Sequence, residues 1–151
     1  MIFDTDILIW FFGGNRKAAA LMESRPDRAV SIISLMELLQ GARSPTEIKV
    51  IRRFFPDNGF RVIPVNESIS HLAATLMDEH ALKGGLQVAD ALIAATARET
   101  GSVLATGNVR RFRALPGIEL KAFRPAERAV RSGRSIGGHR VTLPATGQKP
   151  G

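Results

Sequence analysis

The sequence contains no cysteine among its 151 residues, so it can form neither disulfide bonds nor thiolate metal sites. It also lacks a long apolar run. The longest uninterrupted one, Ile7 to Phe12, falls far short of the roughly 20 residues that a membrane-spanning helix needs. The amino end carries two aspartates and no basic region, which argues against a signal peptide. These absences predict a cytoplasmic protein with no membrane association.

Several functional motifs are missing as well. The sequence has no G-x-S-x-G elbow and no P-loop, so a serine hydrolase or a nucleoside triphosphatase finds little support. His71 and His80 would lie on opposite faces of one predicted helix, which excludes a zinc-binding pair of the i, i+4 kind.

Length and composition predict one globular domain followed by a basic tail. Apolar residues make up 44% of the chain and charged residues 23%, which is typical of a soluble fold. The net charge of +7 is concentrated at the end: residues 1–123 hold 15 Lys+Arg and 13 Asp+Glu, whereas residues 124–151 hold 6 and 1. Gly, Pro, Ser and Arg dominate residues 124–151 and apolar periodicity ends there, so we expect a flexible tail.

Strands and helices alternate along residues 1–123. The predicted strands are short apolar runs, at Ile2–Asp4, Ala29–Ile33, Phe60–Val65, Ser102–Thr106 and Ile118–Phe123. Helices are predicted from their caps and periodicity over residues 5–12, 16–24, 34–41, 45–55, 66–84, 88–100 and 108–114. This alternation predicts an α/β fold with a mainly parallel sheet covered on both faces. In such sheets, ligands bind beyond the carboxyl ends of the strands.

Four carboxylates follow strand-like runs or lie near helix starts, and each also has a structural explanation. Asp4 and Asp6 follow the first strand and either could cap the helix after it. Glu37 lies three residues after Ser34, which is the capping-box spacing. Asp90 falls in the first turn of a helix, where the macrodipole favours a negative charge.

As a set, these acids predict a metal site. A parallel sheet would bring them to one edge, where carboxylates about 5 Å apart repel by roughly 3 kcal/mol per pair at an effective dielectric of about 20. Either some acids are protonated or a cation compensates them. Oxygen donors without cysteine or paired histidine favour Mg²⁺ or Mn²⁺ over zinc. Such an ion can activate water and stabilise charge on a phosphoryl group.

Four sequence blocks resemble those of PIN-domain proteins in order, spacing and hydrophobic context. They are IFDTDILIW, SLMELLQGA, VADALIAATA and LATGNVRRF, and the resemblance covers about residues 1–123. The resemblance is closest to the small VapC-type toxins of toxin–antitoxin pairs. It implies a three-layer α/β/α PIN-like domain that acts as a Mg²⁺- or Mn²⁺-dependent endoribonuclease. It also implies a homodimer and a cognate VapB-type antitoxin that covers the acidic cleft.

The resemblance implies roles for individual residues. Asp4, Glu37 and Asp90 would hold the metal ion, and a metal-bound water would attack the RNA phosphodiester. The family often has a fourth acid in its last block, but Gly107–Phe112 contains none; Asn108 offers a neutral oxygen there, and Asp6 would compensate in part. Thr106, at a strand end, would orient water or the neighbouring aspartate, unless it is simply a β-branched strand residue.

Two other functions stay open at this point. The missing fourth acid motivates a catalytically impaired PIN-like module that binds RNA or protein. Alternatively, IFDTD would be the phosphoryl-acceptor loop of a phosphatase or receiver domain, although neither Lys83 nor Lys121 follows a strand at a suitable place.

Arginines and aromatic residues near the blocks also have two interpretations each. Arg110, Arg111 and Arg113 either meet RNA phosphates beside the acids or form a solvated helix face. We expect Trp10 and the following Phe11–Phe12 pair to pack in the core or at a dimer interface rather than to stack on bases.

Overall fold

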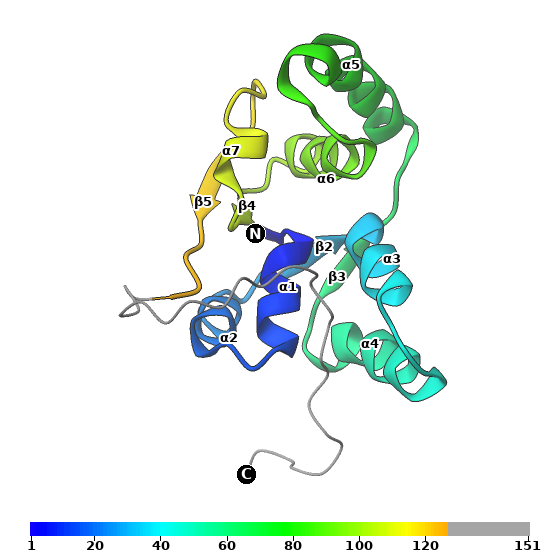
Figure 1. Ribbon diagram of the computed structural model, residues 1–151, viewed down its shortest axis with the longest axis vertical. Coiled ribbons are helices and arrows are strands. Elements are labelled where there is room, and N and C mark those ends of the chain that lie inside the picture. Colours follow the sequence, from blue (N-terminus) through cyan, green and yellow to red (C-terminus); the bar gives the residue numbers. More distant parts are fainter. Residues whose placement is uncertain (127–151) are drawn as a thin grey trace, which may run out of the picture.

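The short apolar runs form a five-stranded sheet in which all strands are parallel, in the order β3-β2-β1-β4-β5. The computed structural model describes residues 1–126, and Figure 1 shows their arrangement. All but the first three residues of the predicted tail, residues 124–151, lie outside this described part. The strands are β1 (Ile2–Phe3), β2 (Ala29–Ser31), β3 (Arg61–Ile63), β4 (Leu104–Thr106) and β5 (Leu120–Ala122). The predicted parallel α/β fold is confirmed.

Helices cover both faces of the sheet (Figure 1). Residues of α1 to α4 share one hydrophobic core with the sheet, and residues of α5 to α7 share a second core on the opposite face. The helices are α1 (Thr5–Phe12), α2 (Arg16–Glu23), α3 (Ile32–Gln40), α4 (Pro45–Asp57), α5 (Glu67–Gly84), α6 (Val88–Glu99) and α7 (Val109–Phe112). Among residues 1–126, none of these helices combines the length and the apolar character needed to cross a membrane.

The two residues of β1 show how the sheet separates the cores. Side chains alternate between the faces of a strand, so Phe3 packs with the α1–α4 core and Ile2 with the α5–α7 core. Both side chains are fully buried. The centre of the sheet is therefore apolar on both faces, as expected of a parallel sheet, and polar chemistry is confined to its edges.

Local signals fix most helix ends. Asn66 caps α5 by accepting from Ile69 N at 2.9 Å, and α5 ends at Gly85, whose φ of 65° is the left-handed conformation that glycine tolerates. Ser44 caps α4 by accepting from Glu47 N at 3.1 Å. These ends lie where the sequence predicts them.

The predicted start of α3 is wrong. The predicted strand over residues 29–33 ends at Ser31, and the helix begins at Ile32 rather than after Ser34. Ser31 is the cap, since its side chain accepts from Ile33 N at 3.1 Å. Glu37 therefore lies within the helix and not at a capping-box position. Ser34 is instead fully buried and faces Thr5, which frees Glu37 for other contacts.

Candidate active site

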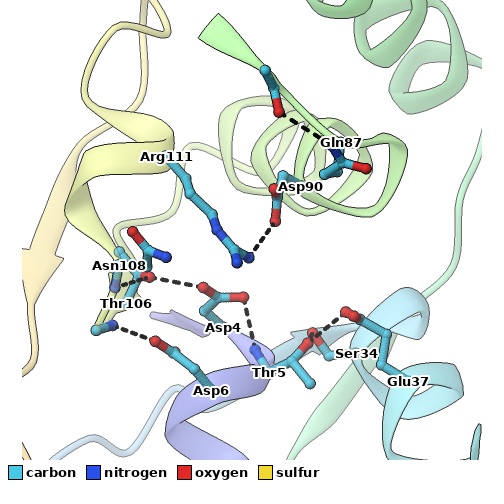
Figure 2. Close-up of polar contacts among 12 residues, drawn as sticks. Asp4, Thr5, Asp6, Ser34, Glu37, Gln87, Asp90, Thr106, Asn108 and Arg111 are labelled. Atoms are coloured by element: carbon cyan, nitrogen blue, oxygen red, sulfur yellow. Dashed lines mark hydrogen bonds and ion pairs between the residues drawn. The ribbon is translucent and has the colours of Figure 1, made fainter. Parts of the chain in front are cut away.

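The predicted acids line one pocket of about 290 Å³ beyond the carboxyl ends of the central strands. Three of them come from the starts of α1 and α6, and the fourth comes from the middle of α3. Figure 2 shows their side chains around this space. The pocket is lined by Asp4, Thr5, Asp6, Ile9, Trp10, Glu37, Asp90, Gly107, Asn108 and Arg111.

Asp4 is held at the end of β1 by contacts to both of its oxygens. It caps α1, because its Oδ1 accepts from Thr5 N at 2.8 Å. Its Oδ2 accepts from Thr106 Oγ1 at 2.7 Å, and Thr106 Oγ1 in turn accepts from Asn108 N at 2.9 Å. Asp4 is only 6% exposed and Thr106 is fully buried. The polar residues at the carboxyl ends of the adjacent strands β1 and β4 are thus joined by a hydrogen bond.

Asp6 ties α1 to the loop after β4. Its Oδ2 accepts from Gly107 N at 2.9 Å, and a Cβ atom added to Gly107 would lie 2.6 Å from the same oxygen. Only glycine permits this approach without displacing the carboxylate. Asp6 Oδ1 is buried and finds no hydrogen-bond partner among residues 1–126. A buried carboxylate oxygen without a donor calls for a cation or a proton.

Glu37 reaches the pocket from α3 and is held by Thr5. The Thr5 hydroxyl donates to Glu37 Oε1 at 2.8 Å and lies 2.9 Å from Ser34 Oγ. Thr5 therefore connects α1 and α3 at the pocket wall.

Asp90 lies in the first turn of α6, as predicted, and is buried. Its partner is a cation from the same chain: Arg111 of α7 reaches across the pocket, with Nη1 3.4 Å from Asp90 Oδ1. Figure 2 shows this side chain extended toward Asp90 above the other acids.

The pocket holds more negative charge than its surroundings neutralise. Burial, and then the charge of Asp6, raise the pKa of Asp4 from 3.8 to about 7, although hydrogen bonds from Thr106 and the Thr5 amide oppose the shift. Burial also raises the pKa of Asp6, against the opposing effects of two backbone hydrogen bonds and of Arg111. Carboxyl groups with raised pKa values in a cleft are candidates for chemistry.

The donor set fits a hard divalent cation. Four carboxylates and the Asn108 amide supply only oxygen ligands, which suit Mg²⁺ and Mn²⁺. The raised pKa of Asp4 and the unpartnered Asp6 oxygen indicate that a positive charge would be accepted there. In the described part of the chain, however, no three acids or histidines stand close enough together to hold an ion as they are placed. Side chains would have to turn inward when an ion binds.

Most residues of this pocket can be predicted from the sequence, but part of its wall cannot. Thr5 belongs to the pocket, and its place between two aspartates is the signal in the sequence that it faces the same space. Trp10 was expected in the core or at a dimer interface; it is 36% exposed and lines the pocket, whereas Phe11 and Phe12 do pack around the α1–α4 core. Gly107 gave no signal from the sequence.

Fold and site together define an α/β protein with an acidic pocket at the carboxyl edge of a parallel sheet. Comparison with known families identifies the class: the PIN domain model matches residues 1–118, and the chain belongs to the PIN domain family. PIN domains are typically metal-dependent nucleases. No curated protein sequence matches the chain.

Solved structures similar to this chain come from toxin–antitoxin complexes. A chain of a toxin–antitoxin complex from Klebsiella pneumoniae is 31% identical, with a TM-score of 0.67, over 83% of this chain and 98% of that chain. A chain of DNA-bound VapBC from Salmonella typhimurium is 26% identical, with a TM-score of 0.66, over 80% and 96%. A chain of VapBC-1 from nontypeable Haemophilus influenzae is 24% identical, with a TM-score of 0.64, over 81% of this chain and 98% of that chain. The fold is that of VapC toxins.

Proposed function

We propose that this protein is a VapC-like toxin, a metal-dependent endoribonuclease that hydrolyses RNA phosphodiester bonds. The observation that supports this most is that Asp4, Glu37 and Asp90 line one pocket, although they belong to three different helices, Asp4 as the cap of α1. When bound there, Mg²⁺ or Mn²⁺ would activate a water molecule and stabilise charge on the phosphoryl group.

Four carboxylates would hold the ion, and their neighbours set its position. Thr106 keeps Asp4 oriented by donating to one of its oxygens, so it acts as a positioning residue. Asp6 would add the oxygen that has no partner among the described residues. Glu37 is oriented by the Thr5 hydroxyl. Asn108 would offer a neutral amide oxygen on the β4 side of the pocket.

An antitoxin of the VapB type and a second copy of the chain are the partners we propose. Homologous chains have been crystallised in complexes with VapB antitoxins and DNA. Two large apolar side chains stand exposed on the helices that contribute Asp6 and Glu37, namely Trp10 at 36% and Met36 at 55%. Exposed apolar surface beside a charged cleft suits a protein partner that covers the cleft.

Cleavage assays on one conservative variant test the proposed activity. Asp90→Asn keeps the shape of the side chain and removes a charge from the pocket, so we expect RNA cleavage with Mg²⁺ or Mn²⁺ to fall by about 100-fold or more. Asp78→Asn is the matched control, because Asp78 is exposed on α5. Cleavage by Asp90→Asn at the wild-type rate, with both variants folded by circular dichroism, would refute the proposal.

A catalytically impaired PIN-like module that binds RNA or protein is the second candidate. Two linked observations favour it. Arg111 contacts Asp90, and the stretch Gly107–Phe112, to which Arg111 belongs, lacks the fourth acid. Titration calorimetry with Mn²⁺ separates the two functions: no binding at millimolar Mn²⁺, together with no cleavage of RNA, would select the binding module.

A further inference from the structure

Among residues 1–126, Arg111 is the one pocket-lining residue with a positive charge, and the packing of α7 directs it there. The next residue, Phe112, is fully buried in the α5–α7 core and anchors this short helix. Successive residues of a helix point about 100° apart, so the burial of Phe112 turns Arg111 toward the pocket. Arg110, its neighbour on the other side, is exposed and does not line the pocket.

The contact between Arg111 and Asp90 has a geometry that allows it to break easily. At 3.4 Å it is longer than the roughly 2.7–2.9 Å of a strong charge-assisted hydrogen bond. The carboxylate side chain is 9% exposed, whereas the arginine side chain is 56% exposed. The guanidinium can therefore swing into solvent at little cost, while Asp90 cannot leave the pocket.

Asp90 needs a positive charge near it whether or not a metal ion is present. A buried carboxylate without a counter-charge is unfavourable. A guanidinium keeps its charge at every physiological pH, so it can serve as a permanent counter-ion. A divalent ion that binds Asp90 would place a second positive charge within a few ångströms of Arg111, and the two cations repel each other.

We propose that Arg111 is an intrinsic counter-ion that competes with the divalent cation for Asp90, so that the metal binds only when the guanidinium is displaced. This inference rests on the metal site of the proposed function. Arg111 would weaken metal binding in the free protein and would compensate the charge of Asp90, though not that of the whole pocket, while no ion is bound. Anything that draws the guanidinium away from Asp90, such as a phosphate group of a bound polyanion, would then strengthen metal binding, because the two effects are linked.

Mn²⁺ titration of the full chain, followed by the loss of the free-ion electron paramagnetic resonance signal, tests this competition. The variant Arg111→Gln keeps a polar side chain of similar length and removes the charge. We expect it to bind Mn²⁺ about tenfold more tightly than wild type, because the ion no longer has to break the half-exposed contact between Arg111 and Asp90. Arg110→Gln, with the same charge change on the same helix, is the matched control and should match wild type.

Two further variants separate failure of this inference from failure of the metal site itself. Arg111→Lys keeps a charge but loses the planar fork, so its affinity should stay closer to wild type than that of Arg111→Gln. Asp90→Asn should weaken Mn²⁺ binding in every background. If Asp90→Asn weakens binding while Arg111→Gln and wild type bind alike, the competition is refuted and the metal site stands. If neither wild type nor Arg111→Gln binds millimolar Mn²⁺, both proposals are refuted.

Discussion

Replacing Asp4 with asparagine probes the excess negative charge of the pocket in the absence of metal. The pKa of Asp4 is 3.8 in an unfolded chain and about 7 in the folded protein. Between these pH values the folded state keeps a proton that the unfolded state has lost. The free energy of unfolding therefore falls as the pH rises through this window, and the full penalty of the charged Asp4 is present above pH 7.

The size of this penalty follows from the shift. One pKa unit corresponds to about 1.4 kcal/mol, so a rise from 3.8 to about 7 amounts to about 4 kcal/mol. Water penetration and side-chain relaxation lower the real cost of a buried charge, and we therefore expect Asp4→Asn to remove about 2–3 kcal/mol of pH-dependent destabilisation. The variant also loses the hydrogen bond that Thr106 donates to Asp4, which costs about 1 kcal/mol at any pH.

Urea unfolding in EDTA, measured by circular dichroism, compares the two proteins at about pH 4.5 and about pH 8, on either side of the transition. The stability of Asp4→Asn relative to wild type should rise by about 2–3 kcal/mol between these conditions. The exposed control Asp78→Asn should show no such change. Millimolar Mg²⁺ should stabilise wild type at the higher pH more than it stabilises Asp4→Asn. A relative stability that is the same at both pH values would show that Asp4 does not carry the buried charge inferred here.

Two other substitutions test the contacts that shape the pocket. Gly107→Ala places a methyl group 2.6 Å from Asp6 Oδ2, so we expect weaker Mn²⁺ binding by calorimetry, whereas Gly84→Ala has open space around it and should bind as wild type. Equal affinities in Gly107→Ala and wild type would contradict the role given to Asp6. Thr106→Val removes the donor to Asp4 and should destabilise the protein by about 1–3 kcal/mol in urea unfolding, while Thr106→Ser should lose less. Equal losses of stability in Thr106→Val and Thr106→Ser would mean that the Thr106 hydroxyl does not contribute to stability.

The overall fold could be predicted because its signals are local. Strand-like runs alternate with capped helices, and the caps at Ser44, Asn66 and Gly85 mark helix ends by backbone chemistry alone. Once a parallel sheet is expected, its carboxyl edge must collect whatever polar residues follow the strands. This is why Asp4 and Thr106, far apart in the sequence, could both be assigned to one pocket.

The parts that escaped prediction depend on tertiary packing. Ser31 and Ser34 offer equal capping chemistry, and only the burial of Ser34 against Thr5 decides between them. In the same way, three arginines lie within or directly after the last block, and the sequence alone does not show which of them faces the pocket. The burial of Phe112 fixes the rotation of α7 and selects Arg111. Periodicity in so short a helix does not reveal this choice.

The hydrogen bond between Asp4 and Thr106 joins residues that are 102 positions apart. On the ribosome, β1 emerges early, yet β4, its neighbour in the sheet, is made almost at the end of the domain. At about 5–20 residues per second, about 5–20 seconds separate the synthesis of these two side chains. A nascent chain thus contains Asp4, Asp6 and Glu37 long before it contains a finished cleft. Whatever reaction the cleft performs can begin only once translation of the domain is nearly complete.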